Sequence, residues 1–202
     1  VYGLTEINRD KIRKSRFIAN PGCYPTSALL PLLPLIKGNF VKKGTIVVDS
    51  KSGVSGAGRT LKNNLLYGEV SDGFSAYGLI SHRHRPEIQS QISAHSSSIY
   101  KILFTPHLLP IKRGILSTIY FCINDNSNIE SVIKCLKDIY AEEKFVKYSE
   151  TLPSTNDVRG TNLCKMKAFF DETTNQVVII SVIDNLIKGA AGQAIQNLNL
   201  ML

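Results

Sequence analysis

One cysteine, Cys23, lies between a turn signal and an apolar segment. The turn is residues 20–22, Asn-Pro-Gly, in which proline fixes φ and glycine permits a sharp bend. Residues 27–35 predict a helix that Pro31 and Pro34 make irregular. Cys23 is therefore expected at a helix N-terminus, where unpaired amides and the helix dipole favour a thiolate nucleophile. A buried, inert cysteine is the common alternative, and the flanking turn and helix argue against it.

A proton acceptor for such a thiol is offered by His82 and His84, two of only four histidines in the chain. Glu87 follows three residues later. A helix over residues 85–98 places His84 and Glu87 on neighbouring turns, so that the carboxylate can orient the imidazole. Nucleophile, base and orienting carboxylate are the parts of a Cys–His catalytic site. The sequence leaves open which of the two histidines is the acid/base.

Arginines near these residues suit an anionic substrate, because the guanidinium fork matches a carboxylate or a phosphate. Arg83 and Arg85 flank His84, and Arg113 precedes a strand. Each arginine taken singly is more often a solvated surface side chain.

Residues 51–59, Lys-Ser-Gly-Val-Ser-Gly-Ala-Gly-Arg, form a Gly/Ser-rich loop after a β-branched strand at 45–50. The spacing fits neither a GxGxxG dinucleotide fingerprint nor a phosphate-binding P-loop. The loop is either a flexible surface connection or one whose bare amides approach an anion or a cofactor.

Composition excludes several classes of protein. The chain has 202 residues and a net charge of +8, enough for one large domain or two small ones. Its Lys and Arg are dispersed without interleaved aromatics, which argues against nucleic-acid binding. Four scattered cysteines lack metal or disulfide spacing and favour a reducing compartment. No apolar run is long enough to span a bilayer, and no signal peptide is visible. Because the sequence starts without Met, we expect a fragment of a longer protein.

The remaining patterns predict an α+β fold, in which helices lie before, between and after several long strands. The strands are expected to form a mixed, largely antiparallel sheet with helices on one face. The predicted helices cover residues 5–12, 23–37, 85–98, 130–144 and 188–202. The predicted strands cover residues 16–19, 45–50, 101–105, 115–124, 146–148, 164–171 and 176–184, and residues 60–80 are expected to be loop-rich.

Five segments in order resemble the N-acetyl-gamma-glutamyl-phosphate reductases, a semialdehyde dehydrogenase-like family. The segments cover nearly the whole chain, and together they form a specific match although each is weak alone. They are Asn-Pro-Gly-Cys-Tyr-Pro-Thr at 20–26, the Gly/Ser-rich loop at 51–59, His-Arg-His-Arg-Pro-Glu-Ile at 82–88, Phe-Thr-Pro-His-Leu-Leu-Pro at 104–110, and Ile-Asp-Asn-Leu-Ile-Lys-Gly-Ala-Ala-Gly-Gln-Ala at 183–194.

The resemblance implies an NADP(H)-dependent oxidoreductase of arginine biosynthesis that reduces N-acetyl-glutamyl 5-phosphate to the semialdehyde and phosphate through a cysteine thioester. It implies an anionic acyl-phosphate substrate, NADPH as cofactor and no metal. The residues that it assigns are Cys23, His84 and Glu87 as catalytic groups, His82, Arg83 and Arg113 as substrate-side groups, and Ser55, Gly56 and Asn185 as cofactor contacts.

The resemblance also implies a missing part, because the family has an N-terminal Rossmann domain and this chain has no such fingerprint. Residues 1–185 correspond to a catalytic and dimerisation domain similar to the second domain of glyceraldehyde-3-phosphate dehydrogenase. Residues 186–202 correspond to a C-terminal helix that packs on the absent NADP-binding domain. We therefore expect the isolated chain to bind NADP weakly and to be inactive. The expected state is a homodimer or homotetramer in the cytoplasm, or in an organelle matrix in a eukaryote.

Three other functions stay open at this point. One methylene of substrate length separates the arginine-pathway enzyme from the N-acetyl-aminoadipyl-phosphate reductase of lysine biosynthesis, and such a difference is worth only about 1–3 kcal/mol. A Cys–His acyl-transfer enzyme would use Cys23 and His84 without nicotinamide. A non-catalytic assembly module would have no need of a reactive Cys23.

Overall fold

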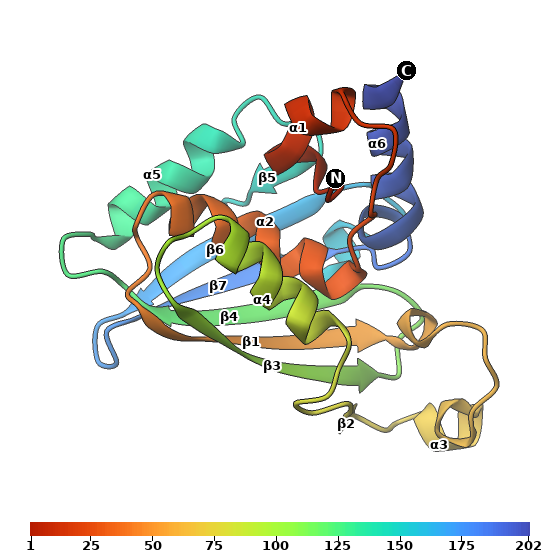
Figure 1. Ribbon diagram of the computed structural model, residues 1–202. Helices are drawn as coiled ribbons and strands as arrows, with labels where there is room; N and C mark the ends of the chain where they lie inside the picture. The colour runs from red at the N-terminus through yellow and green to blue at the C-terminus, as the bar shows by residue number, and fades with distance from the viewer.

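Seven strands form one mixed sheet in the computed structural model, which describes residues 1–202 (Figure 1). The order is β2-β3-β1-β4-β7-β6-β5; β1 pairs with β3 and β5 with β6 in parallel, and the other four pairs are antiparallel. The predicted α+β class is confirmed. The strands are β1 (Gly44–Gly53), β2 (Ser75–Ala76), β3 (Tyr100–Leu109), β4 (Ile115–Cys122), β5 (Val146–Tyr148), β6 (Cys164–Asp171) and β7 (Gln176–Ile183).

Apart from the short helix α3, which lies at the lower right beyond β2, the helices lie on one face of this sheet and at its upper edge (Figure 1). The α-helices are α1 (Thr5–Arg13), α2 (Cys23–Lys37), α3 (Tyr67–Val70), α4 (His84–Ala94), α5 (Ile129–Ile139) and α6 (Gly192–Met201). Short 3-10 turns are η1 (Val54–Ala57), η2 (Asn63–Leu65) and η3 (Thr155–Asp157), and η4 (Ile187–Ala191) is a π-helical turn.

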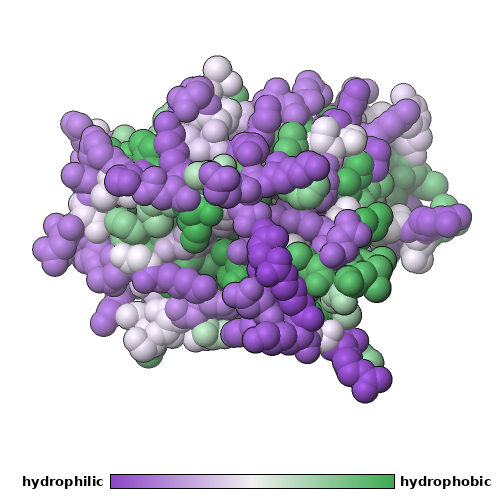
Figure 2. Space-filling model, turned by 90° about the horizontal axis from the view of Figure 1, so that it is seen from above, coloured by the Kyte–Doolittle hydropathy of each residue, from purple (hydrophilic) through white to green (hydrophobic).

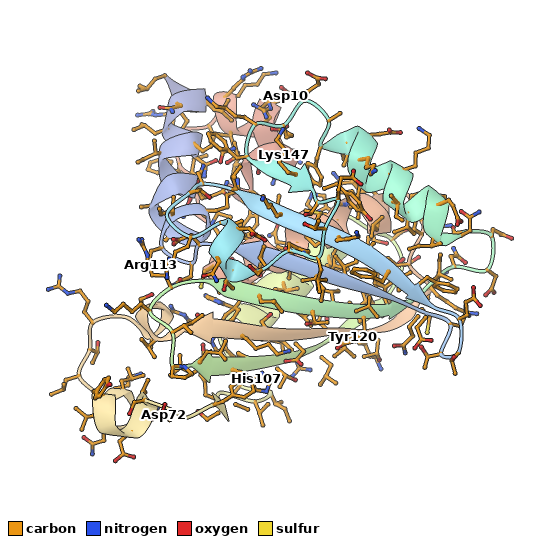
Figure 3. The ribbon with its side chains drawn as sticks, turned by 180° about the vertical axis from the view of Figure 1, so that it is seen from behind. Asp10, Asp72, His107, Arg113, Tyr120 and Lys147 are labelled. Carbon is orange, nitrogen blue, oxygen red and sulfur yellow. The ribbon has the colours of Figure 1, made fainter.

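Burial alternates along the strands, which explains why helices cover only one face of the sheet. In β3, Ile102 and Phe104 are buried towards the helices, whereas Leu103 between them is about half exposed on the other face. Period-two alternation of this kind leaves one face of a sheet for the core and one for solvent or a partner. Figure 3 shows the uncovered face from behind, with no helix lying across it.

Helix α2 is the centre of the core and is buried around nearly its whole circumference. It continues through Pro31 and Pro34, and its apolar side chains pack between the sheet and helices α4 and α5. A helix that is hydrophobic on all sides is expected to be fully enclosed. This enclosure fixes the position of its first residue, Cys23.

Several element boundaries differ from those predicted. Strands β1 and β3 are longer, because each pairs with the other along its whole length, including across Pro106. Helix α4 starts at His84 and ends at Ala94, not at residue 98. The strand expected at 16–19 is only a bridge between Tyr2 and Ala19. The expected C-terminal helix begins with the wider turn η4.

No helix has the length and apolarity needed to cross a bilayer. Seen from above, the surface is mainly hydrophilic, and hydrophobic residues form small separate groups (Figure 2). The hydrophilic residues are spread over this face, in agreement with the dispersed Lys and Arg of the sequence.

Candidate active site

Cys23 is the first residue of α2, and Gly22 is the N-cap, as the turn signal predicts. The thiol is not the thiolate expected from the helix dipole. Burial raises the pKa of Cys23, and this effect outweighs the lowering by the backbone amides of Tyr24 and Cys23 and by the positive charge of Arg83. The resting site therefore holds a protonated thiol, which needs a base to become a nucleophile.

His84 is the first residue of α4, and its imidazole lies against the residue that precedes the cysteine. A β-carbon built on Gly22 would be 2.5 Å from His84 Nε2. Burial, followed by the neighbouring His82 and Arg83, lowers the pKa of His84 to about 4. The imidazole is consequently neutral near pH 7 and able to accept a proton. Its buried Nδ1 has no hydrogen-bond partner.

His82 has a different position. Its Nδ1 accepts a hydrogen bond from the His84 backbone N–H over 3.1 Å, so the proton of a neutral His82 ring lies on Nε2. The ring packs edge-on against Tyr24 and Phe104, and burial lowers its pKa. His82 thus holds the start of α4, and it also lines a cavity of about 490 Å³ together with Arg83 and Tyr77.

Glu87 makes no hydrogen bond to the imidazole of His84, contrary to the expectation from helical spacing. Its Oε1 instead accepts hydrogen bonds from the Gly22 N–H at 2.9 Å and from the Tyr2 hydroxyl at 2.8 Å. The N-cap amide of α2 is one of the unpaired donors of a helix start, and a carboxylate satisfies it well. Glu87 therefore joins α4 to the cysteine loop. Nothing in the sequence marks Tyr2 as its second partner.

Gly189, in turn η4, packs directly on the cysteine. A β-carbon at this position would lie 2.7 Å from Cys23 Cβ, which is closer than two carbon atoms can approach. Sequence reasoning missed this contact, although Gly189 falls within the last of the five resembling segments. The close approach explains why a glycine is required here.

The three expected cofactor residues are brought together at the C-terminal end of β1, the end beside which α2 begins. Asn185 Nδ2 donates to Ser55 Oγ at 3.0 Å, and Asn185 Oδ1 accepts from the Gly114 N–H at 2.7 Å. A β-carbon on Gly56 would be 2.6 Å from Ser52 Oγ. The Gly/Ser-rich loop is thus held to the end of β7, with its tight turn η1 at the edge of the site.

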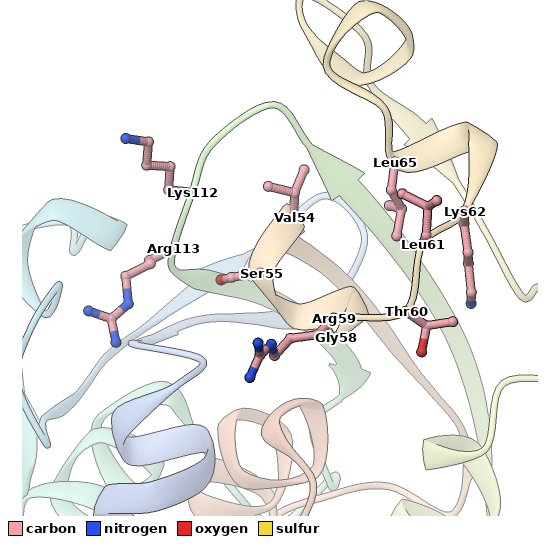
Figure 4. Close-up of a pocket in the computed structure, with 10 residues that line it drawn as sticks. All are labelled: Val54, Ser55, Gly58, Arg59, Thr60, Leu61, Lys62, Leu65, Lys112 and Arg113. Atoms are coloured by element: carbon pink, nitrogen blue, oxygen red, sulfur yellow. The ribbon is translucent and has the colours of Figure 1, made fainter.

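Arg113 lines a cavity of about 500 Å³ next to this loop, together with three other cations, Arg59, Lys62 and Lys112. Figure 4 shows Arg59 and Arg113 extending on either side of Ser55, while Lys112 points away. Arg113 Nε is 3.5 Å from Asp184 Oδ2 and makes no hydrogen bond. Four cations around one hollow favour an anionic ligand.

The remaining arginines divide between the site and the scaffold. Arg83 lines the second cavity beside His82. Arg85 instead donates to the backbone carbonyls of Ile102 and Ile80 at 3.2 Å each, and so fixes α4 to β3. These bonds favour a structural role for Arg85 over the suggested role with a substrate anion.

Gly22→Ala should displace the imidazole of His84, the candidate base for Cys23. The φ and ψ of Gly22, −67° and 158°, are open to alanine, so the backbone accepts the change. The new methyl group meets the His84 ring, and displacement of a catalytic group by about 1 Å costs roughly 100-fold in rate. We expect a loss of that size in kcat in steady-state assays of the protein together with its NADP-binding domain, in a variant that keeps a cooperative melting transition. An active Gly22→Ala protein would show that the His84 position is not critical.

Comparison with known proteins identifies relatives of this site. The family model described as "Semialdehyde dehydrogenase, dimerisation domain" matches residues 23–185. A protein of Arabidopsis thaliana named "Probable N-acetyl-gamma-glutamyl-phosphate reductase, chloroplastic" is 51% identical over 100% of this chain and 51% of its own length. The "N-acetyl-gamma-glutamyl-phosphate reductase" of Geobacter metallireducens is 49% identical over 100% of this chain and 59% of its own.

Solved structures show the same fold at low identity. The "Aspartate Semialdehyde Dehydrogenase from Francisella tularensis" superposes with a TM-score of 0.79 at 12% identity, covering 100% of this chain and 70% of that one. The aspartate semialdehyde dehydrogenase II of Vibrio cholerae gives a TM-score of 0.76 at 17% identity, over 99% and 67% of the two chains. The chain spans about half to three-fifths of the curated relatives it matches. By the extent of the family match, this chain belongs to the semialdehyde dehydrogenase dimerisation-domain family.

Proposed function

We propose that this chain is the catalytic part of an N-acetyl-gamma-glutamyl-phosphate reductase, which converts an acyl phosphate to an aldehyde with NADPH. The observation that carries the proposal is the cysteine at the start of α2 with a neutral imidazole from α4 against Gly22, the residue before it. Relatives at 47–51% identity over the whole chain bear this name. We assign the glutamyl substrate of arginine biosynthesis on the strength of those names.

The first step uses residues of this chain alone. His84 Nε2 takes the thiol proton as Cys23 Sγ attacks the acyl carbon, and the C–O bond to phosphate breaks. The electron pair leaves with the phosphate, His84 returns the proton to it, and a thioester remains on Cys23. Because the thiol is protonated at rest, proton transfer to His84 and attack by sulfur must be coupled.

NADPH, when bound, supplies the hydride that brings the thioester carbon to the aldehyde level. Cys23 then leaves as the thiolate, and its raised pKa favours recovery of a proton before the next turnover. We assign Arg83 and Arg113 to the phosphate and carboxylate of the dianionic substrate. We assign His82 to contact with the substrate, while its hydrogen bond from the His84 backbone N–H orients the start of α4.

The residues of this chain fit the nicotinamide end of NADP. One hydrogen of Asn185 Nδ2 binds Ser55, so the second is free for an amide oxygen. The cavity beside Ser55 is lined with cations that the substrate assignment does not use, among them Arg59 and Lys62. No Gly-rich dinucleotide fingerprint occurs in the 202 residues, so we assign the rest of NADP to a separate N-terminal domain and propose that the chain alone is inactive.

The assignment of NADP to a separate domain divides this chain into two parts. Residues 1–185 form the catalytic and dimerisation domain, and residues 186–202 form the segment that packs on the NADP-binding domain. Helix α6 presents Ile195 and Leu198 to solvent, each half or more exposed, and a shallow groove between α6 and Ile18 lies beside them. An apolar helix face of this kind suits packing against another domain.

We propose a homodimer or homotetramer, since the matching family model is that of a dimerisation domain. The uncovered sheet face carries the exposed side chains of Leu103 and Phe169 and is the natural place for a second copy (Figure 3). We place the protein in the cytoplasm, or in an organelle matrix in a eukaryote. The name of the Arabidopsis relative describes that protein as chloroplastic.

The test is phosphate release from N-acetyl-gamma-glutamyl phosphate, measured with and without NADPH on the purified protein. We expect a burst of about one phosphate per chain without NADPH and a thioester adduct on Cys23 by mass spectrometry. Addition of NADPH and the NADP-binding domain should then release the semialdehyde.

Continuous phosphate release without NADPH would indicate a hydrolase or acyltransferase, and no release at all would indicate an assembly module. A higher kcat/KM for N-acetyl-aminoadipyl phosphate would move the enzyme to lysine biosynthesis.

A further inference from the structure

Three polar side chains form a closed triangle inside the protein, away from the catalytic groups. Lys188 Nζ donates to Glu6 Oε1 at 2.6 Å and to Gln196 Oε1 at 2.9 Å, and Gln196 Nε2 donates to Glu6 Oε1 at 2.7 Å. The side chains of Lys188 and Glu6 are 0% exposed. Glu6 comes from α1, Lys188 from η4 and Gln196 from α6, so the triangle joins three elements.

Turn η4 is unusual in its hydrogen bonding, and it covers the reactive cysteine. The Gly189 N–H bonds to the Asp184 carbonyl and the Ala191 N–H to the Leu186 carbonyl, both five residues back. Such π-type turns are wider than an α-helix, are rare overall, and frequently lie at functional sites. Gly189, next to Lys188 in the chain, is the residue whose Cα packs on Cys23.

A second connection runs from the same turn to the loop that precedes the cysteine. Asn20 Nδ2 donates to the Ala190 carbonyl at 3.2 Å, and Asn197 Nδ2 donates to Asn20 Oδ1 at 3.2 Å. The loop that precedes Cys23 is thus attached to both η4 and α6 through Asn20. The position of η4 therefore decides how closely Cys23 is covered.

A buried ion pair is a poor source of stability compared with apolar side chains of similar size. Its directional hydrogen bonds do, however, fix the relative placement of the elements that carry them. We propose that the Glu6–Lys188–Gln196 triangle positions turn η4 against Cys23 and so controls the accessibility of the reactive thiol. These three are positioning residues, and their importance for turnover rests on the proposed function of Cys23 as nucleophile.

The proposal predicts that loosening the triangle uncovers the sulfur. Burial is the main reason why the Cys23 thiol resists ionisation, while Arg83 and Glu87 are the charged groups acting on it. Neither charge belongs to the triangle, so a change in Cys23 reactivity after a change at Glu6 or Lys188 would arise from movement of η4. A purely structural role would alter the melting temperature and leave this reactivity as it is.

The experiment measures the rate of Cys23 alkylation by iodoacetamide against pH, with exposed Cys122 as the internal reference. The double variant Glu6→Gln with Lys188→Met removes both charges together and leaves no unpaired ion. We expect the midpoint of its profile to fall by about one pH unit, with alkylation about tenfold faster at pH 7. Gln196→Leu, which keeps the ion pair and thereby the fold, should shift the midpoint in the same direction by less.

The matched control is Lys137→Met with Glu150→Gln, which removes an exposed pair of the same charges and should leave the profile unchanged. A wild-type alkylation profile in the folded double variant, or in Gln196→Leu if the double variant does not fold, would overturn the proposal. Alkylation needs neither substrate nor cofactor. The readout therefore stands even if the protein fails to reduce an acyl phosphate, and that separate failure would overturn only the proposed function.

Discussion

Cys23→Ser is expected to lower kcat by about 10⁴-fold or more, the scale seen when a nucleophile is removed from a covalent mechanism. The serine hydroxyl is far less acidic than the thiol. His84, whose pKa is held near 4, is a weak base and would deprotonate it poorly. An ester is also a poorer acceptor of hydride than a thioester. The measurement is steady-state NADPH oxidation in the presence of the NADP-binding domain, combined with mass spectrometry of the protein after exposure to acyl phosphate alone.

Cys122→Ser is the control, because Cys122 is an exposed cysteine at the last residue of β4. The site lies at the other end of this strand, where Gly114 bonds to Asn185. It should retain wild-type kcat and the same mass increase on Cys23. If Cys23→Ser retained a tenth of the wild-type kcat, or if the acyl adduct formed on another residue, a thioester at Cys23 would not be the route of the reaction.

Much of the scaffold could be predicted from the sequence, and the candidate site residues stay predictions. The apolar segment after Cys23 and the Asn-Pro-Gly turn located the start of α2, since both act through local backbone preferences. The hairpin of β6 and β7 was readable for the same reason. Ser55 and Asn185, 130 residues apart, could be paired only through the family resemblance, and they do meet in a hydrogen bond.

Contacts that depend on packing between distant elements could not be predicted from the sequence. Helical spacing favoured a bond from Glu87 to His84, but the Gly22 amide from another helix binds the carboxylate instead. The dipole argument predicted a thiolate, but burial by η4 and the adjoining side chains dominates the pKa of Cys23. Both errors share one cause, because a local pattern cannot show which remote surface will lie against it.

His84→Asn is expected to lower kcat/KM by roughly 10²–10⁴-fold at pH 7, the usual contribution of a general base. Asparagine keeps a polar side chain near the start of α4 but has no site that can accept a proton from sulfur. His95→Asn is the matched control, because His95 follows the last turn of the same helix and its Nδ1 lies 2.7 Å from the Gln91 carbonyl oxygen. That variant should retain wild-type kcat/KM.

The pH profile distinguishes this role from a merely structural one. In the wild-type protein the neutral imidazole accepts the thiol proton during attack, so kcat/KM should be nearly constant from about pH 5 to 8 and fall as pH drops towards the pKa of His84, about 4. Without the base, only thiolate formed beforehand can react. Because burial raises the pKa of Cys23, that fraction grows about tenfold per pH unit across the same range. A His84→Asn profile that is low but flat would mean that the imidazole acts by position and not as the proton acceptor.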